Sequence, residues 1–309
     1  MDMTVLVFGS INADFFVNVT ELPRPGETVL SPTYRTAAGG KGANQAVAAA
    51  RAGSKVAMVG RIGADPFGQT LKDGLKAEGI DVSGIAASDQ PTGAAFIAID
   101  ARGENLILGA GGANLDARAA DVPDALIGPE TTLVLQMEVT PAETAALARR
   151  ARKAGARVIL NLAPALPPPD GLLDDISILV VNEREVEALA KHLGMPERDP
   201  EPAAWALSHH FNKTVIVTLG AAGAIALAPN GAWRIGALAV TVADTVGAGD
   251  AFVGVLAASL DQGHALVAAL KRASIAGGLA CETAGAQAGL PVRARLDARD
   301  KDLAPAQPL

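Results

Sequence analysis

Cysteine is almost absent from this chain, since Cys281 is the only one among 309 residues. A single thiol cannot form an internal disulfide, and such a chain suits a reducing compartment. The first residues, MDMTVLVFGS, carry an acid and lack the basic segment and cleavage site of a secretory signal. The apolar run near the C-terminus is broken at Asp261 and His264, too early for a membrane span. We therefore expect a soluble cytoplasmic protein with no membrane partner.

Aromatic residues are also scarce, at 3% of the chain, and the formal net charge is −7. Few aromatics leave few stacking platforms for single-stranded nucleic acid. An acidic surface disfavours nucleic acid and anionic membranes, although it does not exclude a local site for a phosphorylated ligand. The four histidines show no metal-ligand spacing. Hydrophobic residues make up 50% and charged residues 19%, which indicates a globular chain with a core of small aliphatic side chains.

Short apolar runs alternate with helical patterns along most of the chain. We expect strands at 4–10, 55–63, 132–138, 157–164, 177–183 and 213–220, and helices at 43–53, 65–79, 141–155, 184–194 and, as a final pair, 249–281. Strands that alternate with helices predict a three-layer αβα fold with a mostly parallel central sheet. Two segments, 12–40 and 92–108, break this rhythm.

These two segments are predicted to form a small β-sheet. The first is rich in proline and glycine, and in the second two apolar runs flank DARGEN, which predicts a hairpin. We therefore expect a large domain formed by 1–11, 41–91 and 109–309, and a small β lid formed by 12–40 and 92–108. Exposed strand edges in such a lid favour a homodimer in which the lids pair.

The stretch DTVGAGD, from Asp244 to Asp250, places a carboxylate directly behind a bare turn. The backbone N–H groups at a helix N-terminus attract anions, and Gly247, Ala248 and Gly249 would let a phosphate approach closely. Taken alone, Asp250 is better interpreted as an acid favoured at the start of a helix by the helix dipole.

A second glycine-rich stretch, AAGGKGANQAV, has Gly40 and Lys41 at its centre and leads into a helix. It has neither the Walker spacing nor the position of a dinucleotide fingerprint. It indicates either close approach of the backbone to a ligand or a flexible turn that caps the helix.

Polar residues also stand at the predicted ends of four strands. Asn12 and Asp14 follow the first strand, and Glu138, Asn182, Thr218 and Gly220 stand at the ends of later ones. Ligands of open α/β sheets bind at the carboxyl ends of the strands. Asn12 and Asp14 could bind vicinal hydroxyls or form an Asx turn. Glu185 follows Asn182 by three residues, so this pair could hold a hydrated magnesium ion or form a capping pattern.

Together, and in this order, the motifs GSINAD, PRPGETV, GGKGANQAVAAARAG, NERE, VTLGAAG and DTVGAGD resemble those of the ribokinase-like (phosphofructokinase-B) family of sugar kinases. The resemblance covers residues 4–295. It implies a large α/β domain with a β lid that closes over the sugar. It also implies ATP-dependent phosphorylation of the primary (O5) hydroxyl of a pentose, with D-ribose as the first candidate and with Mg²⁺ and K⁺ as cofactors.

The resemblance further implies a role for each matching residue. Asp250 would be the base, and Gly247, Ala248 and Gly249 would form an anion hole for the γ-phosphate. The sugar would be held by Asn12, Asp14, Gly40, Lys41, Asn44, Glu138 and Asp250. The nucleotide site would include Asn182, Thr218, Leu219, Gly220, Gly223, Gly249 and Ser274, with Glu185 organising Mg²⁺. A monovalent cation would be bound by Asp244, Val246, Ala280, Thr283, Gly285 and Gly289.

Three departures from the family pattern bear on specificity. Gly109 and Ala110 stand where an aliphatic and a polar residue are common near the sugar, which keeps deoxyribose or a nucleoside open as the substrate. Ser274 replaces a larger side chain near the nucleotide base, and Thr283 replaces an arginine at the cation site. A dehydrogenase would need a Gly-x-Gly-x-x-Gly turn after the first strand, which FGSINAD does not provide. A non-catalytic sugar sensor would not need Asp250.

Overall fold

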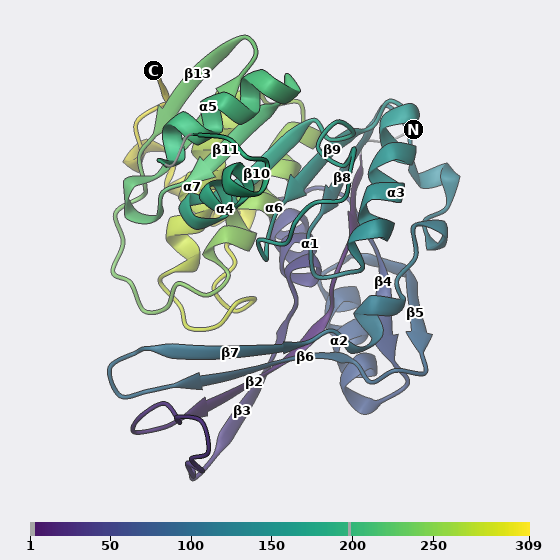
Figure 1. Cartoon of the computed structure of the whole chain (residues 1–309), viewed down its shortest axis with the longest axis vertical. Helices are drawn as coiled ribbons and strands as arrows, with labels where there is room; N and C mark the ends of the chain where they lie inside the picture. Colours follow the sequence, from purple (N-terminus) through teal and green to yellow (C-terminus); the bar gives the residue numbers. More distant parts are fainter. Residues whose placement is uncertain (1–3, 197–198) are drawn as a thin grey trace.

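The computed structural model describes residues 4–196 and 199–309 (Figure 1). Residues 1–3 lie outside this part of the chain. The expected lack of a secretory signal rests partly on them and therefore stays a prediction. Among the described residues, none of the helices combines the length and the apolar character that a membrane crossing requires.

The described strands form a ten-stranded sheet and a four-stranded sheet. The larger sheet has the order β14–β13–β12–β11–β10–β9–β8–β1–β4–β5. Its seven strands from β11 to β5 are parallel, whereas β12, β13 and β14 are antiparallel. The bounds are Thr4–Phe8 (β1), Val56–Gly63 (β4), Asp81–Ser88 (β5), Thr131–Leu135 (β8), Arg157–Asn161 (β9), Ile178–Asn182 (β10), Thr214–Thr218 (β11), Ala224–Ala228 (β12), Gly231–Ile235 (β13) and Gln307–Pro308 (β14).

Helices cover both faces of this sheet, as the alternating pattern predicts. One face carries α1 (Lys41–Arg51), α2 (Pro66–Ala77), α6 (Ala248–Asp261), α7 (Leu266–Ala280) and α8 (Arg293–Ala298). The other face carries α3 (Pro141–Lys153), α4 (Glu183–His192) and α5 (Pro200–Phe211). Val5 and Val7 pack into the first core and Leu6 and Phe8 into the second, because successive side chains of a strand point to opposite faces. The expected three-layer fold is confirmed.

The smaller sheet has the order β3–β2–β6–β7 and projects from the body (Figure 1). Its strands are β2 (Asn12–Asn18), β3 (Tyr34–Gly39), β6 (Gly93–Ile99) and β7 (Asn105–Ala110). Strands β6 and β7 form the expected hairpin, and the carboxylate of Asp100 accepts hydrogen bonds from the N–H groups of Arg102 (2.8 Å) and Glu104 (2.9 Å) in its turn. The two segments thus pair into one sheet as expected, while the proposed division into domains stays a prediction.

Helix α1 begins at Lys41, two residues earlier than the sequence pattern suggested. Gly40 stands directly before it with φ +88°, a conformation that favours glycine. Gly42 lies inside the first turn, where a Cβ atom would be 2.6 Å from the nitrogen of Ser10. The glycines therefore let the start of α1 pack directly on the chain that leaves β1.

Candidate active site

Asp250 occupies the first turn of α6 and is only 6% exposed. Its Oδ2 accepts a hydrogen bond from Nδ2 of Asn44 (2.9 Å), and its Oδ1 accepts one from Nε2 of Gln45 (2.9 Å). Both donors come from the first turns of α1. Asn44 and Asp250 are 206 residues apart in sequence. The two glycine-rich motifs therefore meet at this carboxylate.

The turn before Asp250 has the bare backbone that the sequence indicates. Gly247 precedes α6 with φ +83°. The N–H of Ala248 makes a long hydrogen bond of 3.3 Å to the carbonyl of Thr245. Among the described residues, no acceptor is bonded to the N–H of Gly247 or Gly249. These groups, at the positive end of the α6 dipole, can hold an anion beside the carboxylate.

Lys41 lies among acids. The carboxylate of Asp250 has the largest effect on its ammonium group, and Glu138, Glu185 and Asp14 act in the same direction. These charges raise the pKa of Lys41 in spite of its burial, which by itself would lower the pKa. The side chain therefore stays a cation at the point where negative charges gather.

Asn12 and Asp14 lie in strand β2, not in an Asx turn. Asn12 Oδ1 accepts a hydrogen bond from Nδ2 of Asn114 (2.7 Å), a residue that the sequence analysis did not single out. Asp14 is 7% exposed, and its Oδ1 has no partner in the described part of the chain. A Cβ atom on Gly39 would lie 2.1 Å from Asp14 Oδ2, so only glycine leaves room for this carboxylate.

Burial raises the pKa of Asp14 from 3.8 to about 7, with further upward contributions from Glu138 and Asp250. Arg35 and Lys41 act in the opposite direction. Asp14 is thus an acid that changes its charge near neutral pH, with one free oxygen.

Glu138 joins the same group of side chains from the loop after β8. Its Oε2 accepts hydrogen bonds from the hydroxyl of Ser10 and from the N–H of Lys41 (3.0 Å). Gly40 packs against this region, since a Cβ atom there would lie 2.7 Å from the nitrogen of Asn12. The six predicted sugar-binding residues other than Asp250 therefore gather around the start of α1.

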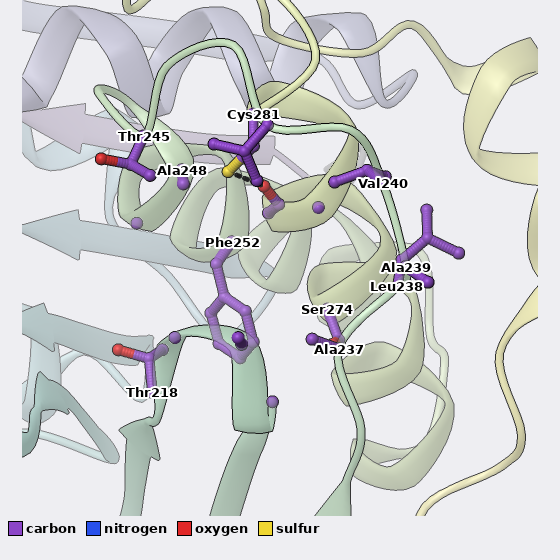
Figure 2. A pocket seen from close by; sticks show the side chains of 17 residues that line it. Thr218, Ala237, Leu238, Ala239, Val240, Thr245, Ala248, Phe252, Ser274 and Cys281 are labelled. Atoms are coloured by element: carbon purple, nitrogen blue, oxygen red, sulfur yellow. Dashed lines mark hydrogen bonds between the residues drawn. The ribbon is translucent and has the colours of Figure 1, made fainter.

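A cavity of about 450 Å³ lies on the other side of the α6 N-terminus. Of the predicted nucleotide-site residues, Thr218, Gly220, Gly223, Gly249 and Ser274 line it. Figure 2 shows Phe252, from α6, between Thr218 and Ser274 in this view. The Ser274 hydroxyl donates to the carbonyl of Gly236 (2.6 Å). The lining is otherwise largely apolar, as suits a flat heterocycle.

A second cavity, of about 210 Å³, connects this space to Asp250. It is lined by Asn182, Glu185, Lys41 and Asp250 among others, and it shares Thr218, Thr245 and Gly249 with the larger cavity. The two cavities therefore meet at the N-terminus of α6. Leu219 does not line either of them; its N–H donates to the carbonyl of Gly223 (2.8 Å) and fixes that turn.

Asn182 and Glu185 form the capping box that the sequence analysis left open. Asn182 Oδ1 accepts from the N–H of Glu185 (2.9 Å), and Glu185 Oε2 accepts from the N–H of Asn182 (2.8 Å). Glu185 Oε1 accepts no hydrogen bond from a described residue, and burial raises the pKa of its carboxyl. Glu185 can therefore start α4 and still offer one oxygen to a hydrated metal ion.

The predicted cation-site residues come together beside this turn. The carboxylate of Asp244 accepts hydrogen bonds from the N–H groups of Val246 (3.0 Å) and Gly285 (2.9 Å), which joins the two loops. A Cβ atom on Gly289 would lie 2.4 Å from the carbonyl oxygen of Ala280 and 3.2 Å from that of Thr283. Converging carbonyl oxygens fit a hard monovalent cation. Within 4–196 and 199–309, no group of three or more His, Cys, Asp or Glu side chains could hold a metal ion.

Cys281 is half-buried and lines the larger cavity, because α7 ends there and the chain turns towards Asp244. Gly109 and Ala110 lie exposed on β7, and nothing is within 4 Å of a Cβ atom placed on Gly109. Gly109 lines none of the cavities described above, so its effect on the choice of sugar stays a prediction.

Sequence reasoning missed several polar residues of the site. Gln45 and Asn161 are hydrogen-bonded to each other (3.0 Å), and Gln136 donates to Gln45 (2.7 Å). Gln136 follows β8 directly, and Asn161 ends β9. The expected strands at 132–138 and 157–164 run past both residues, so the rule that polar residues at strand ends mark the ligand site did not identify them.

This arrangement is that of a phosphotransferase with an alcohol acceptor. A fixed carboxylate stands beside a helix N-terminus that can hold an anion, between a cluster of polar side chains and a nucleotide-sized cavity. Residues 2–293 match the pfkB family carbohydrate kinase domain, and the chain belongs to this family of carbohydrate kinases.

Individual relatives agree with this assignment. A ribokinase of Haemophilus influenzae is 38% identical over 95% of this chain and 97% of its own length. The crystal structure of a ribokinase from Thermotoga maritima superimposes with a TM-score of 0.90 at 31% identity, covering 97% of this chain and 99% of that chain. A ribokinase of Arabidopsis thaliana, solved with ribose and ATP, gives a TM-score of 0.87 at 31% identity, with the same coverage. The family assignment excludes the dehydrogenase alternative.

Proposed function

We propose that the chain catalyses ATP-dependent phosphorylation of D-ribose at its primary (O5) hydroxyl, giving ribose 5-phosphate and ADP. The observation that carries this proposal is the position of Asp250. Its carboxylate lies at the anion-binding N-terminus of α6, where two cavities meet, and faces the cluster formed by Asn44 and Lys41. The ribokinases among its relatives support ribose as the acceptor.

On the sugar side, Asp250 accepts the proton of the attacking hydroxyl. Asn12, Asp14, Gly40, Lys41, Asn44 and Glu138 hold the other sugar groups. Asn44 suits this role because its Nδ2 orients Asp250 while its buried Oδ1 has no partner among the described residues. The same side chain can therefore position the base and accept a hydrogen bond from the sugar.

On the nucleotide side, the base and ribose of ATP occupy the larger cavity, and the phosphates extend to the α6 N-terminus. Asn182, Thr218, Leu219, Gly220, Gly223, Gly249 and Ser274 form or support this site. Gly247, Ala248 and Gly249 hold the γ-phosphate through backbone N–H groups. Mg²⁺, when bound, neutralises charge on the phosphates, and Glu185 would organise it through water.

A monovalent cation, K⁺ in this proposal, fits between the loops that Asp244 joins. Asp244, Val246, Ala280, Thr283, Gly285 and Gly289 would surround it. When bound, such an ion orients loop carbonyls and strengthens the positive field at the anion hole. The chain itself already holds this geometry through the two hydrogen bonds of Asp244.

The direct test is a panel of sugars and nucleosides with ATP and Mg²⁺, with and without K⁺. We expect D-ribose to give the highest kcat/KM and removal of K⁺ to lower turnover. A panel in which no pentose or nucleoside is phosphorylated would overturn the proposed function. Turnover indifferent to K⁺ would remove the cation site alone.

A second candidate substrate is deoxyribose or a nucleoside. The open space at Gly109 favours this alternative, because a larger acceptor could extend towards β7. A higher kcat/KM for one of these compounds than for ribose in the same panel would select it.

Sugar binding should depend on pH through Asp14. Its pKa is raised to about 7, so it is protonated below that pH and ionised above it. Because an ionised carboxylate accepts stronger hydrogen bonds from hydroxyls, we expect the KM for ribose to rise as the pH falls below about 7. Measurement of KM between pH 5.5 and 8.5, with Asp14→Asn as a comparison, checks this. The variant should have a high KM that no longer changes in this range, and an equally pH-dependent KM would contradict the assignment.

We also propose a homodimer in which the small sheets pair. Leu106 and Leu108 on β7 are 39% and 61% exposed, and Phe96 on β6, which pairs with Leu108 and shares the face of the sheet with it, is 49% exposed. A contiguous apolar surface of this kind is typical of an interface. Sedimentation should give the mass of a dimer, and Leu108→Asp should shift it towards the monomer. A monomeric wild type would refute this arrangement. The cytoplasmic location expected from the sequence stays a prediction.

A further inference from the structure

We propose that Gln45 is a positioning residue that fixes the carboxylate of Asp250 for proton transfer, and that Gln136 fixes the amide orientation of Gln45. The inference rests on the proposed role of Asp250 as the base. Gln45 lies two residues after Ala43 and three after Gly42 in α1, on the side of this helix that faces α6. Its side chain is fully buried. It donates from Nε2 to Asp250 Oδ1 (2.9 Å) and to Asn161 Oδ1 (3.0 Å).

Only one orientation of the Gln45 amide satisfies its neighbours. Both hydrogens of Nε2 are used, one for each acceptor, and Oε1 accepts a hydrogen bond from Nε2 of Gln136 (2.7 Å). A flipped amide would place Oε1 against the oxygens of Asp250 and Asn161, and its NH₂ group against that of Gln136. The amide therefore presents a donor to the base and cannot present an acceptor.

The other two hydrogen-bond partners of Gln45, Gln136 and Asn161, come from separate strands of the sheet. Gln136 directly follows β8 and is 1% exposed, and Asn161 ends β9 and is 8% exposed. Asn161 is anchored by its own hydrogen bond from Nδ2 to the carbonyl of Val180 (3.2 Å). A Cβ atom on Gly9 would lie 1.9 Å from Gln136 Oε1, so glycine at this position leaves room for Gln136. Strands β8 and β9 thus hold the residues of the amide chain that ends at Asp250, with Asn161 anchored by a hydrogen bond and Gln136 held by packing, since its buried Oε1 has no partner among the described residues.

The amide chain suits a general base for an electrostatic reason. Asn44 binds one oxygen of Asp250 and Gln45 binds the other, so the carboxylate cannot rotate freely. Neutral donors fix its position without adding a charge that would suppress its basicity. The charged side chains that interact with Asp250 are Lys41, Asp14 and Glu185. Gln45 does not line the two cavities, so its effect should fall on turnover and not on binding.

The test compares Gln45→Met, Gln45→Glu and Gln136→Met in the full chain, with ribose, ATP and Mg²⁺. Methionine keeps the length of the side chain and removes the donors. We expect Gln45→Met to lower kcat by about 10–100-fold with little change in the KM for ribose, because a misplaced reacting group costs about this much. Gln45→Glu should lower it further, and Gln136→Met should give a smaller fall in the same direction.

The pH profile of kcat separates positioning from a general loss of structure. Removal of a donor favours the protonated form of Asp250, so the acidic limb of the profile should move to higher pH in Gln45→Met and further in Gln45→Glu. Leu147→Ala is the control, because Leu147 is fully buried in the core on the opposite face of the sheet. It should lower the Tm and keep kcat and the pH profile.

Several results would overturn the inference. One is an unchanged kcat and pH profile in Gln45→Met; another is a higher KM with the same kcat. A loss of kcat that Leu147→Ala reproduces would show that stability alone is responsible. If Asp250→Asn keeps full turnover, the base assignment fails and this inference fails with it. If only the Gln45 variants keep full turnover, the inference fails and the proposed function stands.

Discussion

Replacement of Asp250 by asparagine is expected to lower kcat by about 10²–10⁴-fold, the usual contribution of a general base. The amide has no basic oxygen to take the proton of the sugar hydroxyl. Asn44 and Gln45 each donate a hydrogen bond to one oxygen of the native carboxylate. In the variant, the NH₂ group of the asparagine must therefore face one of these two donors. Steady-state kinetics gives kcat, and calorimetry should show that ribose still binds.

A matched control exists on the same helix. Asp261 ends α6, about 16 Å along the axis from Asp250, and is 4% exposed. Burial raises the pKa of its carboxyl, so a neutral asparagine should be tolerated. Asp261→Asn is expected to keep the wild-type kcat. Near-normal turnover in Asp250→Asn would show that another group, or none, acts as the base.

The sequence was sufficient for the architecture and for the main groups of the site. Strand and helix patterns predicted the layers because short continuous apolar runs indicate buried parallel strands, whereas the helices between them repeat their apolar residues with a helical period. The glycine-rich motifs predicted close approach of the backbone to a ligand, which stays a prediction; the structure shows that Gly42 packs closely against Ser10. Which acid meets which amide did not follow from either pattern, because Asn44 and Asp250 are 206 residues apart.

The residues that sequence reasoning missed act through tertiary contacts. Gln45 directly follows Asn44, but only the packing of α1 on α6 shows that it reaches Asp250. Asn114 was missed because its role is to hold Asn12 from a short helical turn. The apolar wall of the larger cavity, which includes Leu238 and Val240, carries no chemical signal in the sequence that distinguishes it from a core. Only the folded structure shows that these two residues line the cavity.

Replacement of Gly247 by alanine is the second change with a large expected effect. Gly247 has φ +83°, where an alanine costs roughly 1–2 kcal/mol. The new Cβ atom would also lie 2.8 Å from the Cα and carbonyl oxygen of Ala286, so the backbone must move. Because the N–H groups of this turn are the proposed anion hole, we expect kcat to fall by about 10²–10³-fold, as for loss of one oxyanion donor.

Gly263 provides the control for backbone strain. It has nearly the same conformation, with φ +81°, but nothing lies within 4 Å of an added Cβ atom, and it follows the other end of α6. Gly263→Ala should therefore lose a similar amount of stability in thermal unfolding while keeping kcat. Equal losses of kcat in both variants would mean that α6 transmits strain along its length. A loss confined to Gly247→Ala would support the view that the position of these N–H groups limits phosphoryl transfer.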